Sequence, residues 1–378
     1  MKLFIYSIQL TLLFMVTSSY ALEVAPFEKA LSLAQFERYG KKHTLLVLSD
    51  NGSVVTGIDI SAKTGAYPED RFDLVNQLGY KTLHQFSSID LPRLSLHHKE
   101  LLPLSRISKH HIGVGINYPE HGKETGQKTQ PFLFPKIIQS TGSRETITMQ
   151  PDQLLDYEVE LCARFDQDIK KLEDMKTALV GFFLCGDFTD RAQLMRLIDT
   201  SNTQSGIGFT DAKSKMGYYP TGPYLVVPRN WRDFLKEIRL QLSVNNEIKQ
   251  NSYASEMILS VNELIVKALE TGAESKWLHQ DNKVPILPSK FIRKGAAILT
   301  GTPEGVIFRP PSSGYKFRKI VKYIFTGKFI KMGAKQYVIE QYIEDKLNEK
   351  SYLQPGDLVN LNAPYLGNIL VEISFNRG

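Results

Sequence analysis

Cysteine is scarce in this chain, since only Cys162 and Cys185 occur among its 378 residues. So small a number excludes a fold that is held together mainly by disulfide bonds, although an oxidising compartment would permit one bond between the two thiols. Cys162 comes two residues after Glu160, and Cys185 comes two residues before Asp187, so in extended strands each thiol shares a face with an acid. If the two strands are neighbours, a disulfide on that face is one alternative and two buried free thiols are the other.

Long apolar runs are missing after the N-terminus, which excludes a further membrane-spanning helix. At the N-terminus itself, Lys2 precedes an apolar stretch at residues 3–16, and small residues follow up to Ala21. This pattern predicts a signal peptide at residues 1–21, and the stretch is shorter than the roughly 20 residues that the alternative, a membrane anchor, requires. We therefore expect export into a bacterial periplasm and no stable membrane insertion after cleavage.

The chain also lacks a large excess of charge of one sign. It has 46 Lys and Arg residues and 40 Asp and Glu residues, a net charge of +6, and its basic residues are spread along the sequence. This distribution argues against nucleic acid as a partner. One stretch, residues 316–335, is locally basic; a solvated face is the favoured interpretation, and contact with an anionic surface or ligand is the alternative.

No internal repeat or low-complexity segment occurs, and the length suffices for two domains. We expect a small N-terminal β-containing domain at residues 22–106 and a larger domain at residues 107–378. A polar and basic insertion at about 307–352 interrupts the larger domain. Its strand-like segment at 337–343 predicts an ordered excursion.

Local patterns predict several individual elements. Residues 26–39 are typical of a helix, and an Asp-Asn-Gly turn at residues 50–52 lies between apolar runs that predict a hairpin. A second hairpin is expected to turn at Asn245-Asn246. Residues 253–269 carry an apolar stripe at helical spacing, with Ser252 or Ser255 as the expected N-cap.

The most informative acids are Glu158 and Glu160, in the run Asp-Tyr-Glu-Val-Glu-Leu at residues 156–161. Side chains at i and i+2 of a strand project from one face, where two carboxylates repel unless the face is wet, a proton is shared or a hard cation lies between them. Asp187 ends a second apolar run and can supply a third oxygen ligand. The spacing alone is more typical of a solvated sheet face, but the apolar surroundings weaken that interpretation.

A metal held by carboxylates needs a separate base nearby for proton transfer. His121 and Glu124 are candidates, because a three-residue spacing on a helical turn lets a carboxylate orient an imidazole. An exposed surface pair is the simpler interpretation of so short a pattern.

Lys213 is a candidate for stabilising an oxyanion, a part that Lys215 can play equally well. Solvated surface lysines are the simpler interpretation of both. The turn Gly301-Thr302-Pro303 offers backbone N–H groups and a hydroxyl, as many turns do.

Together, and in this order, these segments resemble the fumarylacetoacetate hydrolase superfamily. The ordered series covers about residues 111–373 and is highly specific. Its motifs are Gly-Ile-Asn-Tyr at 115–118 with His121 and Glu124, Phe-Pro-Lys at 134–136, the acidic run at 156–161, Gly-Asp-Phe-Thr-Asp-Arg at 186–191, Ala-Lys-Ser at 212–214, Pro-Thr-Gly-Pro at 220–223, Val-Asn-Asn-Glu at 244–247 with Gln250, Gly-Thr-Pro-Glu-Gly-Val at 301–306 and Pro-Gly-Asp at 355–357.

The resemblance implies an α+β fold, a mixed β-sandwich roll of the fumarylacetoacetate hydrolase type preceded by a small N-terminal β-containing domain. It also implies a homodimer. The divalent metal would be Mg²⁺ or Mn²⁺, with Ca²⁺ in some members, held by Glu158, Glu160 and Asp187. Oxygen-only ligation agrees with these metals independently.

The resemblance further implies the roles of the remaining site residues. His121 with Glu124 would activate water or move a proton, and Lys213 would stabilise the enolate or oxyanion. The expected substrate-binding residues are Arg191, Gly301 and Thr302.

Activities in the superfamily include hydrolysis of carbon–carbon bonds in β-diketo acids, decarboxylation of oxo-dicarboxylic acids, and isomerisation or hydration. We therefore predict an exported, metal-dependent hydrolase that cleaves a carbon–carbon bond in a small diketo or oxo-carboxylic acid of the fumarylacetoacetate or acylpyruvate kind. The alternatives are an oxaloacetate-type decarboxylase, an isomerase or hydratase of the same superfamily, and a noncatalytic metal- or ligand-binding protein.

The chain departs from the family pattern in three places. After Arg191 the family commonly has Asp, an apolar residue and Gln, whereas this chain has Ala192-Gln193-Leu194. Ile137 stands where Pro is expected after Lys136, and the insertion falls beside a pocket-lining turn. These departures leave two alternatives open, an atypical substrate and a lost activity.

Overall fold

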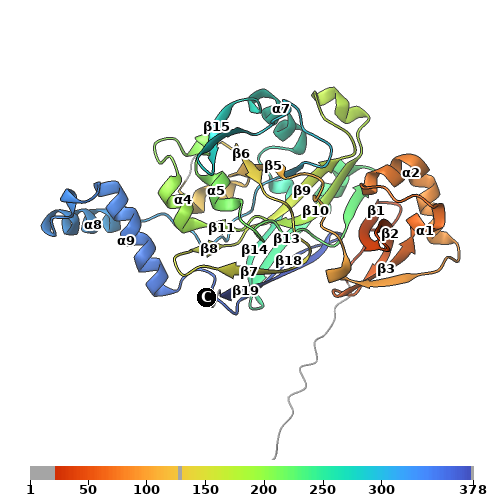
Figure 1. The fold of residues 1–378 in the computed structure, drawn as a ribbon, viewed down its shortest axis with the longest axis horizontal. Coiled ribbons are helices and arrows are strands. Elements are labelled where there is room, and N and C mark those ends of the chain that lie inside the picture. Colours follow the sequence, from red (N-terminus) through yellow and green to blue (C-terminus); the bar gives the residue numbers. More distant parts are fainter. Residues whose placement is uncertain (1–21, 127–129, 376–378) are drawn as a thin grey trace, which may run out of the picture.

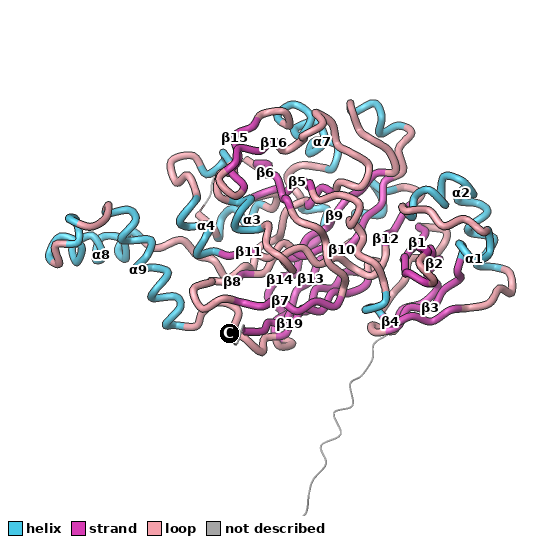
Figure 2. Tube along the Cα trace, viewed as in Figure 1, coloured by secondary structure: helices cyan, strands magenta, loops and turns pink. Residues whose placement is uncertain are grey.

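The computed structural model describes residues 22–126 and 130–375 of the chain. The expected signal peptide, residues 1–21, lies outside this part. None of the helices in these two ranges has the length and apolar character needed to cross a membrane. Strands occupy the middle of the molecule and helices lie around them (Figure 2).

The larger sheet has ten strands and joins the N-terminal strands to those of the larger part. Its neighbouring strands are antiparallel except for β17 and β5, which are parallel. In spatial order the strands are β4 (Leu94–His97), β3 (Val54–Asp59), β2 (Lys41–Asp50), β1 (Ala30–Arg38), β12 (Leu225–Pro228), β10 (Val180–Gly186), β9 (Val159–Phe165), β17 (Ala297–Leu299), β5 (His110–Gly115) and β6 (Phe132–Ile137).

A five-stranded sheet packs on one face of the larger sheet. Leu161 and Phe182 of the larger sheet share a hydrophobic core with Leu242 and Leu361 of the smaller one. The strands of the smaller sheet, in order, are β14 (Glu247–Tyr253), β13 (Arg239–Val244), β18 (Leu358–Ala363), β19 (Gly367–Phe375) and β7 (Arg144–Met149). Two-stranded sheets are formed by β8 (Leu155–Asp156) with β11 (Thr189–Asp190) and by β15 (Ser275–His279) with β16 (Asn282–Pro285).

Helices surround the sheets, most of them short apart from α2 and α7, and α8 and α9 belong to the insertion. The α-helices are α1 (Ile60–Thr64), α2 (Arg71–Ser88), α3 (Pro119–Glu124), α4 (Arg191–Leu197), α5 (Phe209–Lys213), α6 (Trp231–Glu237), α7 (Val261–Thr271), α8 (Ser313–Phe325) and α9 (Ala334–Glu349). Single 3₁₀ turns occur at η1 (His98–Glu100), η2 (Leu172–Lys176), η3 (Thr203–Ser205), η4 (Ala254–Glu256) and η5 (Lys328–Ile330).

The N-terminal strands lie at one end of the molecule and the helices α8 and α9 project from the other (Figure 1). Strand β1 pairs with β12, so the N-terminal strands extend the ten-stranded sheet of the larger part. A buried ion pair adds to this junction, because Arg164 of β9 donates to Asp70 at 2.7 Å.

Two elements differ from the secondary structure that the sequence predicts. The helix predicted at residues 26–39 is wrong, because its second half is strand β1, whose first seven residues are buried. Burial on both faces removes the polar alternation by which a strand is recognised. The strand predicted at residues 337–343 is also wrong, because it lies in helix α9. The buried residues of α9 repeat at helical spacing and are Tyr337, Val338, Tyr342 and Ile343.

The helix predicted at residues 253–269 begins later than expected. Helix α7 starts at Val261 and is capped by Ser260, which forms a capping box with Glu263. Neither Ser252 nor Ser255 is the N-cap. The reason is tertiary, since Asn117 accepts the backbone N–H groups of residues 258 and 259 at 2.8 Å and holds that segment out of the helix.

Both expected hairpins are present. Strands β2 and β3 turn through residues 51–53, and β13 and β14 turn at Asn245-Asn246, both of which have positive φ. The two cysteines are joined by a disulfide bond, Cys162 lying on β9 and Cys185 on the adjacent β10.

Candidate metal centre and active site

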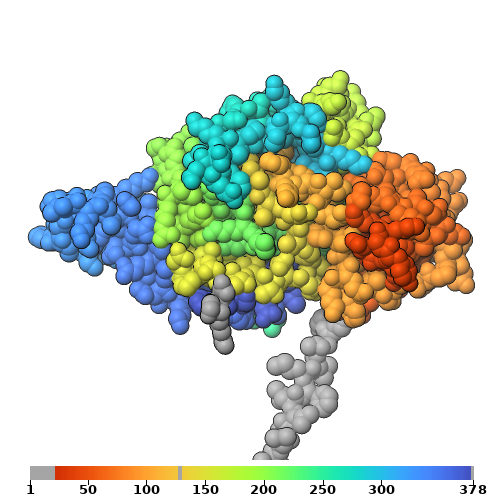
Figure 3. All heavy atoms as spheres, viewed as in Figure 1, coloured from red at the N-terminus to blue at the C-terminus, as the bar shows by residue number. Residues whose placement is uncertain are grey.

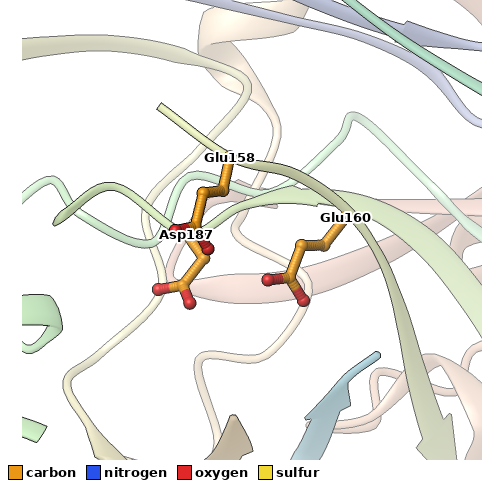
Figure 4. A group of neighbouring side chains, drawn as sticks. All are labelled: Glu158, Glu160 and Asp187. Atoms are coloured by element: carbon orange, nitrogen blue, oxygen red, sulfur yellow. The ribbon is translucent and has the colours of Figure 1, made fainter. Parts of the chain in front are cut away.

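Three carboxylates meet where strand β9 begins and strand β10 ends. The two strands are antiparallel, so the residues at these two ends lie at the same edge of the sheet. Glu158 and Glu160 come from one strand end and Asp187 from the other, and their carboxylates point into one space (Figure 4). One oxygen of each lies within 4.8 Å of the others, and all three side chains are buried.

Two buried lysines contact these acids. Lys213, at the end of α5, donates to Glu158 Oε2 at 2.7 Å and to Asp187 Oδ2 at 2.8 Å. Burial alone would lower the pKa of Lys213, but Asp187 and Glu158 outweigh it and raise that pKa. Lys136, on β6, bonds Asp187 Oδ1 and donates to the carbonyl of Lys213 at 2.7 Å. Both ammonium groups are therefore fixed against the metal-ligand candidates.

Arg191 forms the next layer. It donates to Glu158 Oε1 at 2.7 Å and to Asp156 Oδ2 at 2.8 Å. Asp156 also accepts the backbone N–H groups of Ile307 and Phe308, the first residues of the insertion. The start of the insertion is thus tied to the centre through the side chains of Asp156 and Arg191.

Glu160 differs from its neighbours because no cation bonds it within the described residues. Its Oε2 accepts the backbone N–H of Gly301 at 2.7 Å, but its Oε1 is buried without a hydrogen-bond partner. Burial, with the charges of Asp187 and Glu158, raises the pKa of Glu160 well above its usual range. A buried carboxylate oxygen that faces two other acids suits a hard divalent cation, so the three residues fit a metal of the Mg²⁺ or Mn²⁺ type.

His121 and Glu124 form a buried pair on helix α3. His121 Nδ1 lies 2.8 Å from Glu124 Oε1, and the two side chains are only 9% and 12% exposed. Glu124 is held in turn by the backbone N–H of Gly305 at 3.0 Å and by Arg309 at 2.9 Å. This burial argues against the exposed surface pair, and the geometry leaves the imidazole Nε2 for another partner.

A small cavity of about 90 Å³ unites the two groups. Glu158, Lys213 and Arg191 line it together with His121. Most of its remaining wall is apolar: Val114, Ile116, Phe132, Phe134, Leu194, Met195, Ile198, Phe209 and Phe308. The cavity therefore combines a charged end with a hydrophobic wall.

A larger cavity of about 540 Å³ lies beside the first, under the insertion. The two cavities share wall residues, among them Met195, Ile198 and Phe308. On its other side the larger cavity is lined by Ile320 of α8 and by Val338 of α9. The insertion thus lengthens the hydrophobic wall of the site.

Comparison with known proteins identifies the family of the chain. The sequence profile of the family described as fumarylacetoacetate (FAA) hydrolase, C-terminal, matches residues 110–373. The chain belongs to the fumarylacetoacetate hydrolase family. The resemblance stated from the motifs is therefore confirmed, and the α+β fold with its N-terminal β part is confirmed by the structural neighbours of this family member.

Two of these structural neighbours illustrate the similarity in fold. A fumarylacetoacetate hydrolase from Exiguobacterium antarcticum has a TM-score of 0.56 at 19% identity, over 92% of this chain and 100% of its own. A 2-hydroxyhepta-2,4-diene-1,7-dioate isomerase from Mycobacterium marinum has a TM-score of 0.52 at 16% identity, over 92% and 100% of the two chains. At these identities the likeness shows the fold.

Relatives by sequence include two uncharacterized staphylococcal proteins. The protein from Staphylococcus epidermidis is 30% identical over 274 residues, 70% of this chain and 68% of its own length. The protein from Staphylococcus aureus strain USA300 is 28% identical over 220 residues, 57% of this chain and 64% of its own length. The match thus spans slightly less than two thirds of the S. aureus protein.

The expected substrate-binding residues of this family member divide into two groups. Arg191 and Thr302 line the small cavity, and the Thr302 hydroxyl donates to the carbonyl of Val159 at 2.9 Å. The N–H of Gly301 is instead directed at Glu160, so Gly301 positions a metal-ligand candidate. Its φ of +94° and the 2.8 Å approach of a Cβ to Asn117 explain why glycine stands there.

Lys215, the alternative to Lys213, pairs with Asp190 and does not line the cavity.

Sequence reasoning gave no role to three polar residues that build the centre. Lys136 was one, although a lysine among apolar residues on a strand is the signal of a buried charge. Asp156 was another, and it anchors Arg191. The third is Gln250, which accepts the N–H of Val159 and donates to the Thr302 hydroxyl, both at 2.9 Å.

Replacing Lys136 with methionine is expected to lower the free energy of unfolding by about 3 kcal/mol, because it leaves the buried Asp187 carboxylate without one of its cations. Equilibrium urea unfolding without added metal checks this. The matched control is Lys176→Met, since Lys176 is exposed and forms no ion pair among the described residues. An unchanged stability of the Lys136 variant would contradict the assigned contact.

Proposed function

We propose that the protein is a divalent-metal-dependent hydrolase that cleaves a carbon–carbon bond in an acylpyruvate-like diketo acid. The observation that carries this proposal is one cavity lined by both Glu158 of the acidic centre and His121 of the His–Glu pair. A protein that only binds a metal or ligand has no need of a buried imidazole oriented by a carboxylate.

Each residue has a defined part in this reaction. Glu158, Glu160 and Asp187 would hold the metal ion, which when bound polarises carbonyl oxygens of the substrate. Glu124 accepts from His121 Nδ1, so Nε2 takes a proton from a water molecule as its oxygen attacks the acyl carbonyl. The bond from that carbon to the methylene then breaks, and its electron pair stays on the pyruvate fragment as an enolate.

The ammonium group of Lys213 stabilises the enolate, since it lines the cavity beside Glu158. The imidazolium returns its proton to the enolate carbon, and the products are a carboxylic acid and pyruvate. One water is consumed for each bond cleaved, and His121 ends in its starting protonation state.

The charge of the centre suits an anionic substrate. The centre contains four carboxylates and three cations, so with every carboxylate ionised a divalent metal would leave it with a single positive charge. The carboxylates are Asp156, Glu158, Glu160 and Asp187, and the cations are Lys136, Arg191 and Lys213. A 2-oxo carboxylate is complementary to such a site.

The direct test is turnover by the purified protein with Mg²⁺ or Mn²⁺. We expect about one divalent metal per chain. We also expect metal-dependent release of pyruvate from acylpyruvates, which product analysis measures. The panel includes oxaloacetate and fumarylacetoacetate. Decarboxylation or a change in ultraviolet absorption without cleavage would favour the alternative family activities, and metal binding without any turnover would favour a binding protein.

The apolar wall predicts a preference for hydrophobic acyl groups. Each additional methylene that enters the larger cavity should raise kcat/KM by about fourfold, the equivalent of about 0.8 kcal/mol of burial. Acylpyruvates of increasing chain length provide the measurement. Filling that cavity with Ile339→Trp should remove the gain for long chains and spare short ones, whereas the exposed substitution Ile330→Trp should change neither.

Three further properties are part of the proposal. Export to a bacterial periplasm rests on residues 1–21, and a homodimer rests on the family resemblance alone. The choice between Mg²⁺, Mn²⁺ and Ca²⁺ is likewise a prediction, which metal analysis of the protein as purified addresses.

A further inference from the structure

The insertion contains a helical hairpin that stands out from the body of the molecule. We call residues 312–349 the insertion lobe; it comprises α8, η5 and α9. The lobe projects at the far left of Figure 1, and Figure 3 shows it emerging from the surface on that side. From residue 312 to residue 339 the sequence has no acidic residue and seven basic ones: Lys316, Arg318, Lys319, Lys322, Lys328, Lys331 and Lys335.

One face of α8 packs against α9. Tyr315 contacts Tyr342 at a ring distance of 5.5 Å, and Tyr323 contacts Tyr337 at 5.3 Å. Between these two tyrosines, Lys319 forms an ion pair with α9. The spacing of 315, 319 and 323 places all three on one side of the helix, so this side is committed to the hairpin itself.

The opposite face of α8 is apolar and faces solvent. Phe317, Ile320 and Ile324 follow at i, i+3 and i+7 along it, and Ile320, at the edge of this face, also lines the larger cavity. They are 68%, 40% and 58% exposed. Scattered exposed apolar residues are ordinary on a soluble protein, but an aligned stripe is typical of a binding surface.

The tip of the lobe, where α8 leads into α9, carries further exposed apolar residues. Phe325, Phe329 and Ile330 are 87%, 58% and 81% exposed. Lys328 and Lys331 flank them and are exposed without an ion pair among the described residues. The sequence predicts a solvated face for residues 316–335. The lysines at the tip are solvated, but large exposed apolar side chains lie between them.

We propose that the insertion lobe docks the protein on an anionic lipid bilayer. Phe325, Phe329 and Ile330 enter the interface between headgroups and acyl chains, and the surrounding lysines contact lipid phosphates. Helices with an apolar stripe and a basic polar face bind at this depth without crossing the membrane. The proposal does not depend on the reaction that the protein catalyses.

The charge of the lobe also decides between possible occupants. A second copy of the chain would bring another basic lobe to the same surface, and like charges at close range repel. Anionic lipid supplies both an apolar layer for the stripe and negative charge for the lysines. The larger cavity lies at the root of the lobe, with Lys316 and Lys335 in its wall.

Vesicle co-sedimentation of the full chain tests the proposal. Residues 1–21 are identical in the wild type and in every variant, so differences in binding do not come from that segment. We expect binding to vesicles of equal parts phosphatidylcholine and phosphatidylglycerol, weakened by salt, and at least about tenfold weaker binding to phosphatidylcholine alone. The combined substitution Phe325→Ser, Phe329→Ser and Ile330→Ser should weaken binding at least about tenfold. Its matched control is Tyr39→Ser, which removes a side chain that is 93% exposed at the other end of the molecule.

A charge series separates electrostatic docking from simple apolar adhesion. Reversing Lys322, Lys328 and Lys331 to glutamate should abolish the preference for anionic vesicles. Reversing the exposed residues Lys63 and Lys176 to glutamate should leave it intact. Circular dichroism and turnover without vesicles verify that each variant is folded.

A probe at the tip locates the contact. Because both native cysteines are buried in the disulfide, Phe329→Cys provides a single reactive thiol for an environment-sensitive fluorophore. A blue shift with anionic vesicles at this position and none at Lys63→Cys is expected. The proposal would be overturned if the wild type and the tip variant bound vesicles equally well, or if the wild type bound both lipid compositions equally well. It would also be overturned if the wild type self-associated and the tip variant did not, because a second copy of the chain would then be the occupant.

Discussion

Glu160→Gln is expected to abolish divalent-metal binding and turnover while leaving the metal-free fold intact. The glutamine keeps the shape of the side chain but removes the charge of Glu160, the one of the three carboxylates of the centre that no cation bonds among the described residues. Even groups that only support metal ligands contribute 10–100-fold to affinity, so the loss of a ligand should weaken binding at least about 100-fold. Isothermal titration with Mn²⁺ measures this.

Stability measurements distinguish this loss from misfolding. Burial beside Asp187 and Glu158 disfavours the ionised form of Glu160 and raises its pKa well above the usual range. The neutral glutamine therefore should not lower the free energy of unfolding without metal. Added Mn²⁺ should stabilise the wild type by mass action and fail to stabilise the variant.

The same pKa shift predicts how metal affinity depends on pH. A proton held on Glu160 must leave when the metal binds, so the wild-type affinity should rise with pH above the usual glutamate range. The Glu160→Gln variant should lack this component. Glu173→Gln, which changes an exposed glutamate, is the control. A variant that binds metal as tightly as the wild type would refute the assignment of Glu160 as a ligand.

His121→Ala is expected to reduce turnover by about a thousandfold and to leave metal affinity unchanged, because a positioned base contributes 10²–10⁴-fold. His121 lines the cavity, but its Nδ1 is bonded to Glu124 and it is not among the three acids of the centre. Steady-state kinetics and Mn²⁺ titration of the same preparation give both quantities. Glu124→Gln should reduce kcat less, since the imidazole remains.

Helix α3 itself offers a matched control. Lys123 and Glu120 form an ion pair with the same three-residue spacing, but their side chains are 71% and 58% exposed. Removing that pair by Glu120→Gln should leave kcat and KM unchanged. If His121→Ala retained full activity while Glu160→Gln lost it, the reaction would need the metal but no base, which would favour a decarboxylation.

Much of the centre could be predicted because its geometry is local. The two-residue spacing of Glu158 and Glu160 at a strand end needs only the period of a β-strand. The three-residue spacing of His121 and Glu124 needs only one helical turn. Asp187 required one further assumption, that β9 and β10 are neighbours, and their antiparallel pairing confirms it.

Other features depend on contacts that local patterns do not encode. Strand β1 has a helix-compatible pattern because it is buried on both faces, and the start of α7 is set by Asn117, a residue far away in the sequence. The role of Lys136 follows from its contact with Asp187, 51 residues further along the chain. The solvent exposure of Phe325 likewise depends on tertiary structure, because an apolar residue on a helix is buried only if another segment packs on it.

By itself the sequence determined the family, the α+β class and the types of residue available for chemistry, because ordered motifs and short spacings are properties of the chain. Only the tertiary structure decided which acid lacks a cation, which lysines neutralise the others, and which N–H orients Glu160. It also decided that the insertion extends the cavity with one part of its surface and exposes an apolar stripe with another. These outcomes depend on burial and on pairing between distant segments, and a one-dimensional pattern specifies neither.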